Sequence, residues 1–191
     1  MKNFRHLFLL FIFAFSAEGA FARQVLVDFR SEESSGFWSP LTDMVRGGRS
    51  TAFMALQNDQ TGKISGELFL QDGFGFASYR VTPTEKPSWN IQGSNEVAIE
   101  AKGDGRSYRI LLKDARAYSA SEDYSWQFEF TPRASFEQVR IPLDRLRPIF
   151  RGRELEDLPP IDLAEILEIG IQINDGIEGP YSIELKSIEA I

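Results

Sequence analysis

The sequence predicts an all-β fold, an antiparallel β-sandwich or barrel with one short helix in the C-terminal third. After residue 23 most of the chain alternates apolar and polar residues with a period of two, which is typical of half-buried strands. The alternating stretches are short, and turns rich in Gly, Pro, Asp and Asn separate them. About ten short strands joined in this way favour two packed antiparallel sheets or a barrel.

The expected strands follow one another along the chain. They cover residues 25–29, 51–57, 63–71, 75–82, 96–103, 107–114, 125–132, 137–143, 169–175 and 181–191. In the stretch 125–132, Trp126, Phe128 and Phe130 alternate with Gln127 and Glu129. The three aromatic side chains are therefore expected in the core, on one face of their strand.

Residues 159–170 are the stretch for which a helix is predicted. Two prolines precede it, and the Asp162 side chain can cap its first turn. Leu163, Ile166 and Leu167 share one face at helical spacing, and Gly170 can end the helix. The helix is expected to cover one open end of the sandwich.

Residues 1–22 are expected to form a secretory signal peptide, and residues 23–191 a single domain. Lys2 and Arg5 give a basic start, residues 7–15 are an unbroken apolar run, and residues 20–22 read Ala-Phe-Ala, a small-x-small cleavage site. The apolar run is shorter than the roughly 20 residues that span a membrane. The mature chain is expected to begin at Arg23 and to be periplasmic or secreted.

The composition argues against several functions. The chain has no cysteine and one histidine, His6, which lies in the predicted signal peptide. Nucleophile systems built on His and zinc sites built on Cys and His are therefore not expected. The net charge of −7 argues against nucleic acid as a partner. We expect a monomer without a cofactor or a metal ion, although Asp104, Asn174 and Asp175 at Gly turns are an alternative calcium site.

The stretch "TDMVRGGRS", residues 42–50, combines two glycines with two arginines. A phosphate loop would feed its glycines into a helix N-terminus, whereas here they precede a strand. Gly47 and Gly48 are instead expected to allow backbone angles that a tight turn requires. Asp43 is expected to cap the same turn through backbone N–H groups.

Five motifs in order resemble one known family. They are "DMVRGGRS", "SGELFLQDGFGFASYR", "GDGRSYRILL", "FEQVRIPLDRLRPIFRGREL" and "EIGIQINDGIEGPYSIELKSIEAI". Together they are similar to the complex I intermediate-associated protein 30 family, from Trp38 to Ile191. The resemblance implies a galactose-binding-domain-like jelly roll, akin to family 11 carbohydrate-binding modules. In the first motif Asp43, Gly47, Gly48 and Ser50 match the family, whereas Arg46 stands where the family usually has Met.

The resemblance also implies a role, that of a non-catalytic helper or binder. Mitochondrial members of the family assist the assembly of respiratory complex I, while the predicted signal peptide separates this chain from their compartment. The expected function is an exported binding or assembly-helper module whose partner, a protein client or a glycan, stays open. The alternatives are a carbohydrate-binding module, with Trp38, Trp89 and Tyr118 as stacking platforms, and a glycosidase or lyase with paired carboxylates.

Arginines, carboxylates and loop aromatics are the side chains left for recognition. We expect Arg80 and at least one of Arg106, Arg151 and Arg153 to share a groove. The full set of candidate groove residues is Trp38, Asp43, Arg80, Asp104, Arg106, Arg151 and Arg153. The glycines expected at structural turns are Gly47, Gly48, Gly103, Gly105 and Gly152.

Overall fold

The structure, a computed structural model, describes residues 23–31, 37–84, 86–121 and 123–191. The predicted signal peptide, residues 1–22, lies outside the described residues. Within the described part, no helix has both the length and the apolar character needed to cross a membrane.

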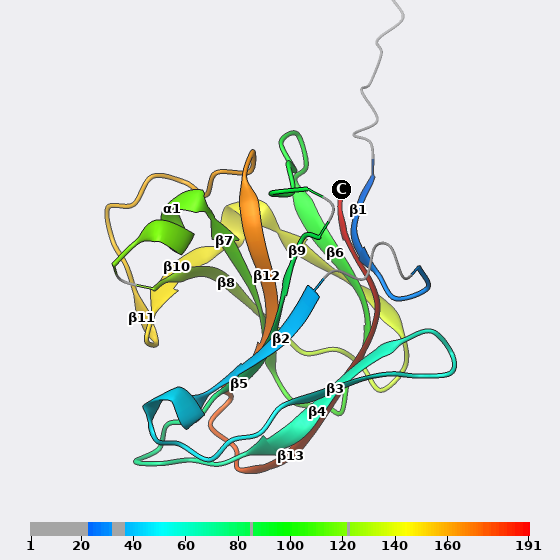
Figure 1. Cartoon of the computed structure of the whole chain (residues 1–191), viewed down its shortest axis with the longest axis vertical. Helices are drawn as coiled ribbons and strands as arrows, with labels where there is room; N and C mark the ends of the chain where they lie inside the picture. The colour runs from blue at the N-terminus through cyan, green and yellow to red at the C-terminus, as the bar shows by residue number, and fades with distance from the viewer. Residues whose placement is uncertain (1–22, 32–36, 85, 122) are drawn as a thin grey trace, which may run out of the picture.

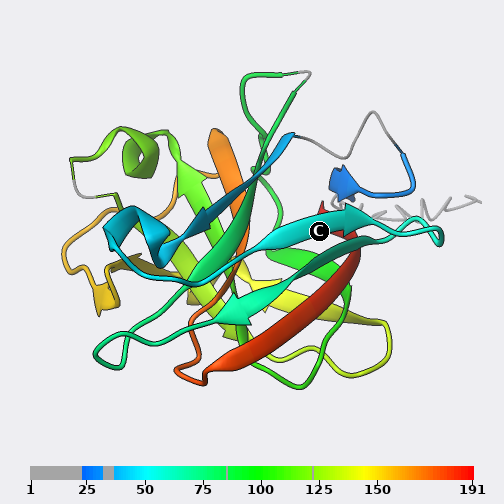
Figure 2. The same ribbon diagram turned by 60° about the horizontal axis from the view of Figure 1, so that its bottom comes forward.

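Two antiparallel sheets form a β-sandwich, as predicted (Figures 1 and 2). Among the described residues, the six-stranded sheet has the order β3-β4-β13-β6-β9, with β1 beside β13. Its strands are β1 Gln24–Asp28, β3 Phe53–Leu56, β4 Gly62–Leu68, β6 Glu96–Lys102, β9 Glu137–Pro142 and β13 Gly179–Ala190.

The seven-stranded sheet of the described chain has the order β11-β10-β8-β7-β12-β5-β2. Its strands are β2 Phe37–Thr42, β5 Ala77–Thr82, β7 Tyr108–Asp114, β8 Ser125–Phe130, β10 Arg147–Phe150, β11 Arg153–Glu154 and β12 Ile166–Ile173. The short helices are η1 Asp43–Arg46, α1 Ala115–Ser119 and η2 Leu143–Arg145. In both views α1 and η1 lie on the same side of the molecule, beside the seven-stranded sheet (Figures 1 and 2).

The core lies between the two sheets. Val81, Ile110 and Ile171 enter it from neighbouring strands of the seven-stranded sheet, and Ile99 and Ile183 enter it from the six-stranded sheet. All five are at most 1% exposed, which is what the period-two alternation of these strands requires. Burial of such side chains contributes roughly 1.5–3 kcal/mol each.

The register predicted for the strand over 125–132 holds. Trp126, Phe128 and Phe130 stand opposite Leu112, Ile110 and Tyr108, which are all buried in the core. Trp126 and Phe130 are buried, and Phe128 is partly buried against the core.

The prediction of a helix over residues 159–170 is wrong. Ile166–Ile173 is β12, a central strand between β7 and β5, and the short helix α1 lies at Ala115–Ser119 instead. The apolar face of the predicted helix was only two turns long, whereas Ile169 and Ile171 gain a fully buried position on the inner face of the sheet. Packing in the sheet therefore outweighs a weak helical pattern.

Candidate functional site

Asp43 holds the turn that joins the two sheets. Its carboxylate accepts hydrogen bonds from the Ser50 backbone N (2.9 Å), the Ser50 Oγ (2.6 Å) and the Phe76 backbone N (3.2 Å). Gly47 follows η1 with φ +86°, in the left-handed region. A Cβ on Gly48 would overlap the Asp43 carboxyl group. Residues 42–50 therefore form a backbone turn whose acid is fully used within the fold.

Arg106 braces a loop at one end of the sandwich. Its guanidinium forms a two-pronged ion pair with Asp175 (2.7 and 2.9 Å) and donates to the backbone carbonyls of Ile177, Gly179 and Pro180. Burial is the largest single influence and works to raise the pKa of Asp175. The hydrogen bonds from Arg106 and from the Ile177 backbone N, together with the positive charge of Arg106, outweigh it, so the pKa lies below its ordinary value. These contacts hold the β12–β13 connection in place.

Asp104 stands beside this brace and is also used inside the fold. It accepts hydrogen bonds from the Tyr108 hydroxyl (3.0 Å), the Arg106 backbone N (3.0 Å) and the Ser182 backbone N (2.7 Å). Among the described residues, no group of three or more His, Cys, Asp or Glu side chains is arranged to hold a metal ion.

Arg151 and Arg153 lie at the β10–β11 hairpin, the far edge of the seven-stranded sheet. Arg151 has φ +50° and stacks over the Phe150 ring, 5.0 Å from its centroid. Arg153 stands opposite Phe150 in the strand pair. Four strands, β12, β7, β8 and β10, separate β11 from the Arg80 strand β5. At about 4.8 Å per strand, these arginines lie more than about 20 Å from Arg80.

The tryptophans are held in the interior or against it. Trp38 stacks on Phe29 with ring centroids 5.6 Å apart and packs on the core. Trp89 is 3% exposed and pairs with Ile166 through its backbone. Neither ring is free to stack on a sugar in this arrangement.

Arg80 points away from the core on the outer face of the seven-stranded sheet. Its neighbours along β5, Tyr79 and Val81, face the core, so alternation turns Arg80 outward. It forms an ion pair with Glu168 at 3.0 Å, and both side chains are mostly buried. Its Nε atom is buried and has no hydrogen-bond partner among the described residues.

Two more ion pairs lie on this outer face. Arg109 of β7 binds Glu129 of β8 at 3.1 Å. Lys113, also of β7, binds Asp123, although Lys113 is only 5% exposed and points away from the core. The burial of Lys113, which points away from the core, shows that this part of the face is shielded, whereas Asp123 and Glu129 are exposed. The outer face of the seven-stranded sheet, with its ion pairs Arg80–Glu168, Arg109–Glu129 and Lys113–Asp123, is the candidate site and is called the ion-pair face below.

The charges of the ion-pair face act on one another. Burial works to raise the pKa of Asp123, but the hydrogen bond and the charge of Lys113 lower it, and Arg80 and Arg46 add to this effect. The net result is a pKa below the ordinary value of an aspartate. Arg46, the residue that departs from the family motif, therefore contributes to the field at this face from η1.

Of the candidate residues, Arg80 is the one on the ion-pair face. Sequence reasoning missed the site role of its five companions, Arg109, Lys113, Asp123, Glu129 and Glu168. Arg109, Lys113 and Glu168 lie within or at the ends of otherwise apolar strand segments, "RILLKD" and "EIGIQI". A charged residue in such an apolar segment is the sequence signal that could have identified them. The groove role predicted for the candidate residues stays a prediction.

The comparisons with known proteins agree with this fold. The family model for complex I intermediate-associated protein 30 matches residues 27–185. An uncharacterised protein of Schizosaccharomyces pombe is 30% identical over 165 residues, which cover 78% of this chain and 75% of that protein. The mitochondrial complex I intermediate-associated protein 30 of Mus musculus is 23% identical over 180 residues, covering 86% of this chain and 55% of that protein.

Solved structures similar to the chain include carbohydrate-binding modules. The family 11 module of the cellulosomal cellulase Lic26A-Cel5E of Clostridium thermocellum has a TM-score of 0.65 and 14% identity, and the match covers 90% of this chain and 95% of that module. The same type of module in complex with a β-1,3-1,4-mixed-linked tetrasaccharide has a TM-score of 0.62 and 14% identity, covering 88% and 95%. At this identity the likeness establishes the jelly-roll fold.

The predicted periplasmic or secreted location is wrong. The mouse relative is a mitochondrial protein, which contradicts a location read from residues 1–22 alone. Those residues carry Lys2 and Arg5 and no acid before Glu18. A basic segment poor in acids is common to secretory and mitochondrial targeting sequences, so these charges do not decide between compartments.

The family model covers most of the described domain, and a relative with 30% identity covers it as well. The chain belongs to the complex I intermediate-associated protein 30 family.

Proposed function

We propose that the chain is a non-catalytic binding module that helps to assemble a protein complex, and that its client contacts the ion-pair face. Residues 23–191 form the single domain that carries this role. The mouse relative is named for association with an intermediate of complex I, and it is mitochondrial. We infer the same class of client, a membrane-protein assembly intermediate, and a mitochondrial location for this chain.

The observation that carries the proposal is the chemistry of the ion-pair face. Its three carboxylates, Asp123, Glu129 and Glu168, are each bound by a cationic side chain. A glycosidase needs one carboxylic acid and one free carboxylate across a cleft, an arrangement that these pairs do not offer. Fixed charged pairs on a partly exposed surface instead favour selective contact with a polar protein surface.

Carbohydrate binding is the second candidate, and it rests on the fold of the similar modules. Of the three aromatic residues predicted as platforms, Tyr118 of α1 is exposed, whereas Trp89 is buried and Trp38 packs on Phe29. Titration of the full chain with the mixed-linked tetrasaccharide tests this candidate by calorimetry. Saturable heat that Tyr118→Ala abolishes would favour the carbohydrate function over the assembly role.

Affinity capture with matched variants tests the assembly role. The tagged full chain is captured from detergent-solubilised membranes of cells that express it, and its partners are identified by mass spectrometry. Arg109→Glu places a negative charge beside Glu129 on the ion-pair face. Arg140→Glu is the control, because Arg140 makes a comparable pair with Glu96 at 3.0 Å on the other sheet. We expect Arg109→Glu to lose the captured complex and Arg140→Glu to keep it.

Arg80→Gln is a second test within the same face, and circular dichroism checks that each variant is folded. A captured complex that survives both Arg109→Glu and Arg80→Gln contradicts the proposal.

A further inference from the structure

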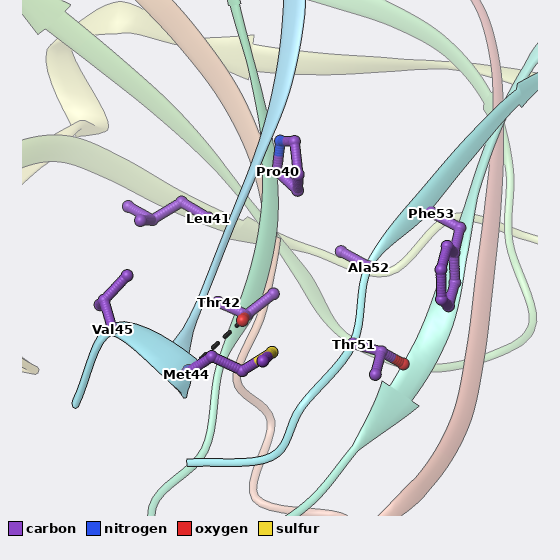
Figure 3. Close-up of a pocket in the computed structure, with 8 residues that line it drawn as sticks. All are labelled: Pro40, Leu41, Thr42, Met44, Val45, Thr51, Ala52 and Phe53. Atoms are coloured by element: carbon purple, nitrogen blue, oxygen red, sulfur yellow. Dashed lines mark hydrogen bonds between the residues drawn. The ribbon is translucent and has the colours of Figure 1, made fainter. Parts of the chain in front are cut away.

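An apolar hollow lies where the two sheets end beside each other. It has a volume of about 260 Å³ and lies between residues 40–45 of β2 and η1 and residues 51–53 at the start of β3 (Figure 3). Met44, Val45 and Phe53 line it and are exposed. Its chemistry differs from that of the ion-pair face, because most of the side chains that line it are apolar.

The edge strand β3 beside this hollow is unprotected against pairing. Its four residues, Phe53 to Leu56, include no charge, no proline and no glycine. Phe53 is 63% and Leu56 is 65% exposed. Proteins normally protect edge strands with charges, prolines or bulges, because an open edge pairs readily with another strand.

The other edge strands of the described chain carry such protection. β2 contains Pro40, and β1 has a bulge between Val25 and Val27. β9 contains charged residues and ends at Pro142, and β11 consists of Arg153 and Glu154. The contrast singles out β3 as the edge at which pairing is not opposed.

The free hydrogen-bonding groups of β3 belong to its even-numbered positions. The backbone N of Thr51 donates to Glu67, and that of Gln57 donates to Thr61, both on the β4 side. Odd-numbered residues therefore bond to β4, and alternation turns the N–H and C=O groups of Ala52, Met54 and Leu56 outward.

We propose that β3 pairs antiparallel with β3 of a second copy of this chain, which joins the two six-stranded sheets into one. One register pairs all the outward backbone N–H and C=O groups of the two strands. In it, Met54 lies opposite Met54 of the second copy, and Ala52 lies opposite Leu56 of the second copy. The exposed Leu56 is then covered, and the hollow beside Phe53 is closed by the second copy.

Charge complementarity supports a second copy as the occupant. Arg49 lies five residues before Met54, and Asp59 lies five residues after it. The two-fold register therefore brings Arg49 of one copy to the turn that holds Asp59 of the other, twice in the dimer. Arg49 stacks on Phe69 at 4.9 Å and Asp59 accepts from Thr61, and within the described chain neither forms an ion pair.

Sedimentation velocity of the full chain tests the dimer. We expect a mass twice the 21.7 kDa of the chain at micromolar concentration. Leu56→Lys adds a charge to the exposed edge and is expected to halve that mass. Phe74→Lys is the matched control, because Phe74 is an exposed apolar residue outside β3, and it is expected to remain dimeric.

The register is tested by exchange of charges. Arg49→Asp and Asp59→Arg are each expected to raise the dimer Kd about tenfold, and the double variant is expected to restore it. A monomer in the unaltered chain, or a dimer that survives Leu56→Lys, overturns the proposal. A double variant that remains as weak as the single variants overturns the register. The monomer predicted from the sequence is the alternative outcome of this experiment.

Discussion

Asp43 and its glycine neighbours show how single residues set the shape of the turn at residues 42–50. Gly47 is required for its backbone angle, since a side chain added there meets nothing within 4 Å but its φ is +86°. Gly48 is required for space, since an added Cβ overlaps the Asp43 carboxyl group. The two adjacent glycines are thus needed for different reasons: Gly47 avoids backbone strain, and Gly48 avoids a steric clash.

Gly48→Val is expected to lower the free energy of unfolding by about 1–3 kcal/mol, because it displaces Asp43 from Ser50 and Phe76. Urea denaturation measures the change. Gly73→Ala is the comparison: Gly73 also has a positive φ and open space around it, so it reports strain without displacement of an acid. Equal stability of Gly48→Val and the unaltered chain contradicts the role given to Asp43.

The Arg106–Asp175 pair is a second case in which one residue supports a loop. Arg106→Ala is expected to destabilise the fold by roughly 3–5 kcal/mol, because it leaves a mostly buried carboxylate without its cation. Arg109→Ala is the control and is expected to cost less than about 1 kcal/mol, since its partner Glu129 is exposed. Thermal unfolding of both variants distinguishes a brace from a surface pair.

The same pair predicts a dependence of stability on pH. The folded-state pKa of Asp175 is depressed, so its contribution is present above the ordinary pKa of an aspartate, about 3.9, and is lost as the pH falls through the folded value. Asp175→Asn is therefore expected to flatten the loss of stability below about pH 4. Unfolding curves that show the same acid slope in both proteins contradict this assignment.

At the scale of elements, alternation was sufficient for most strands, but it missed β2, β10, β11 and the start of β12. Trp126 and Phe130 were placed correctly because their strand alternates strictly. The strand expected over residues 169–175 is the second half of β12. The start of β12 lacks this alternation, and its pairing with β7 extends the strand back to Ile166. The ion pair Arg80–Glu168 was not predictable either, because it also depends on the pairing of β12 with β5. It joins residues 88 positions apart, and local patterns carry no information on such pairs.

The central position of β12 predicts slow hydrogen exchange. The backbone amides of Ile169 and Ile171 are expected to be among the most protected of the chain, since both residues are at most 1% exposed in the middle of the sheet. Exchange followed by mass spectrometry or NMR measures this protection. Fast exchange over residues 166–173 contradicts the strand assignment.

For the whole molecule, the two surfaces differ in the chemistry of recognition. The ion-pair face presents fixed charges from central strands, whereas the open side at β2 and β3 presents apolar side chains and a free strand edge (Figure 3). Such a division would let one copy bind a client while it pairs with a second copy. Because the two surfaces do not share residues, loss of one interaction is expected to leave the other unchanged.

Site-specific photo-cross-linking tests most directly that the client contacts the ion-pair face. A photoreactive residue replaces Gln172, which alternates with Ile171 and Ile173 and therefore points outward beside Arg109. A second protein carries it at Ser65, which lies on β4 of the other sheet. We predict a covalent adduct with a subunit of the captured complex from position 172 and none from position 65. Adducts from position 65 alone would contradict the account, because they would place the client on the six-stranded sheet.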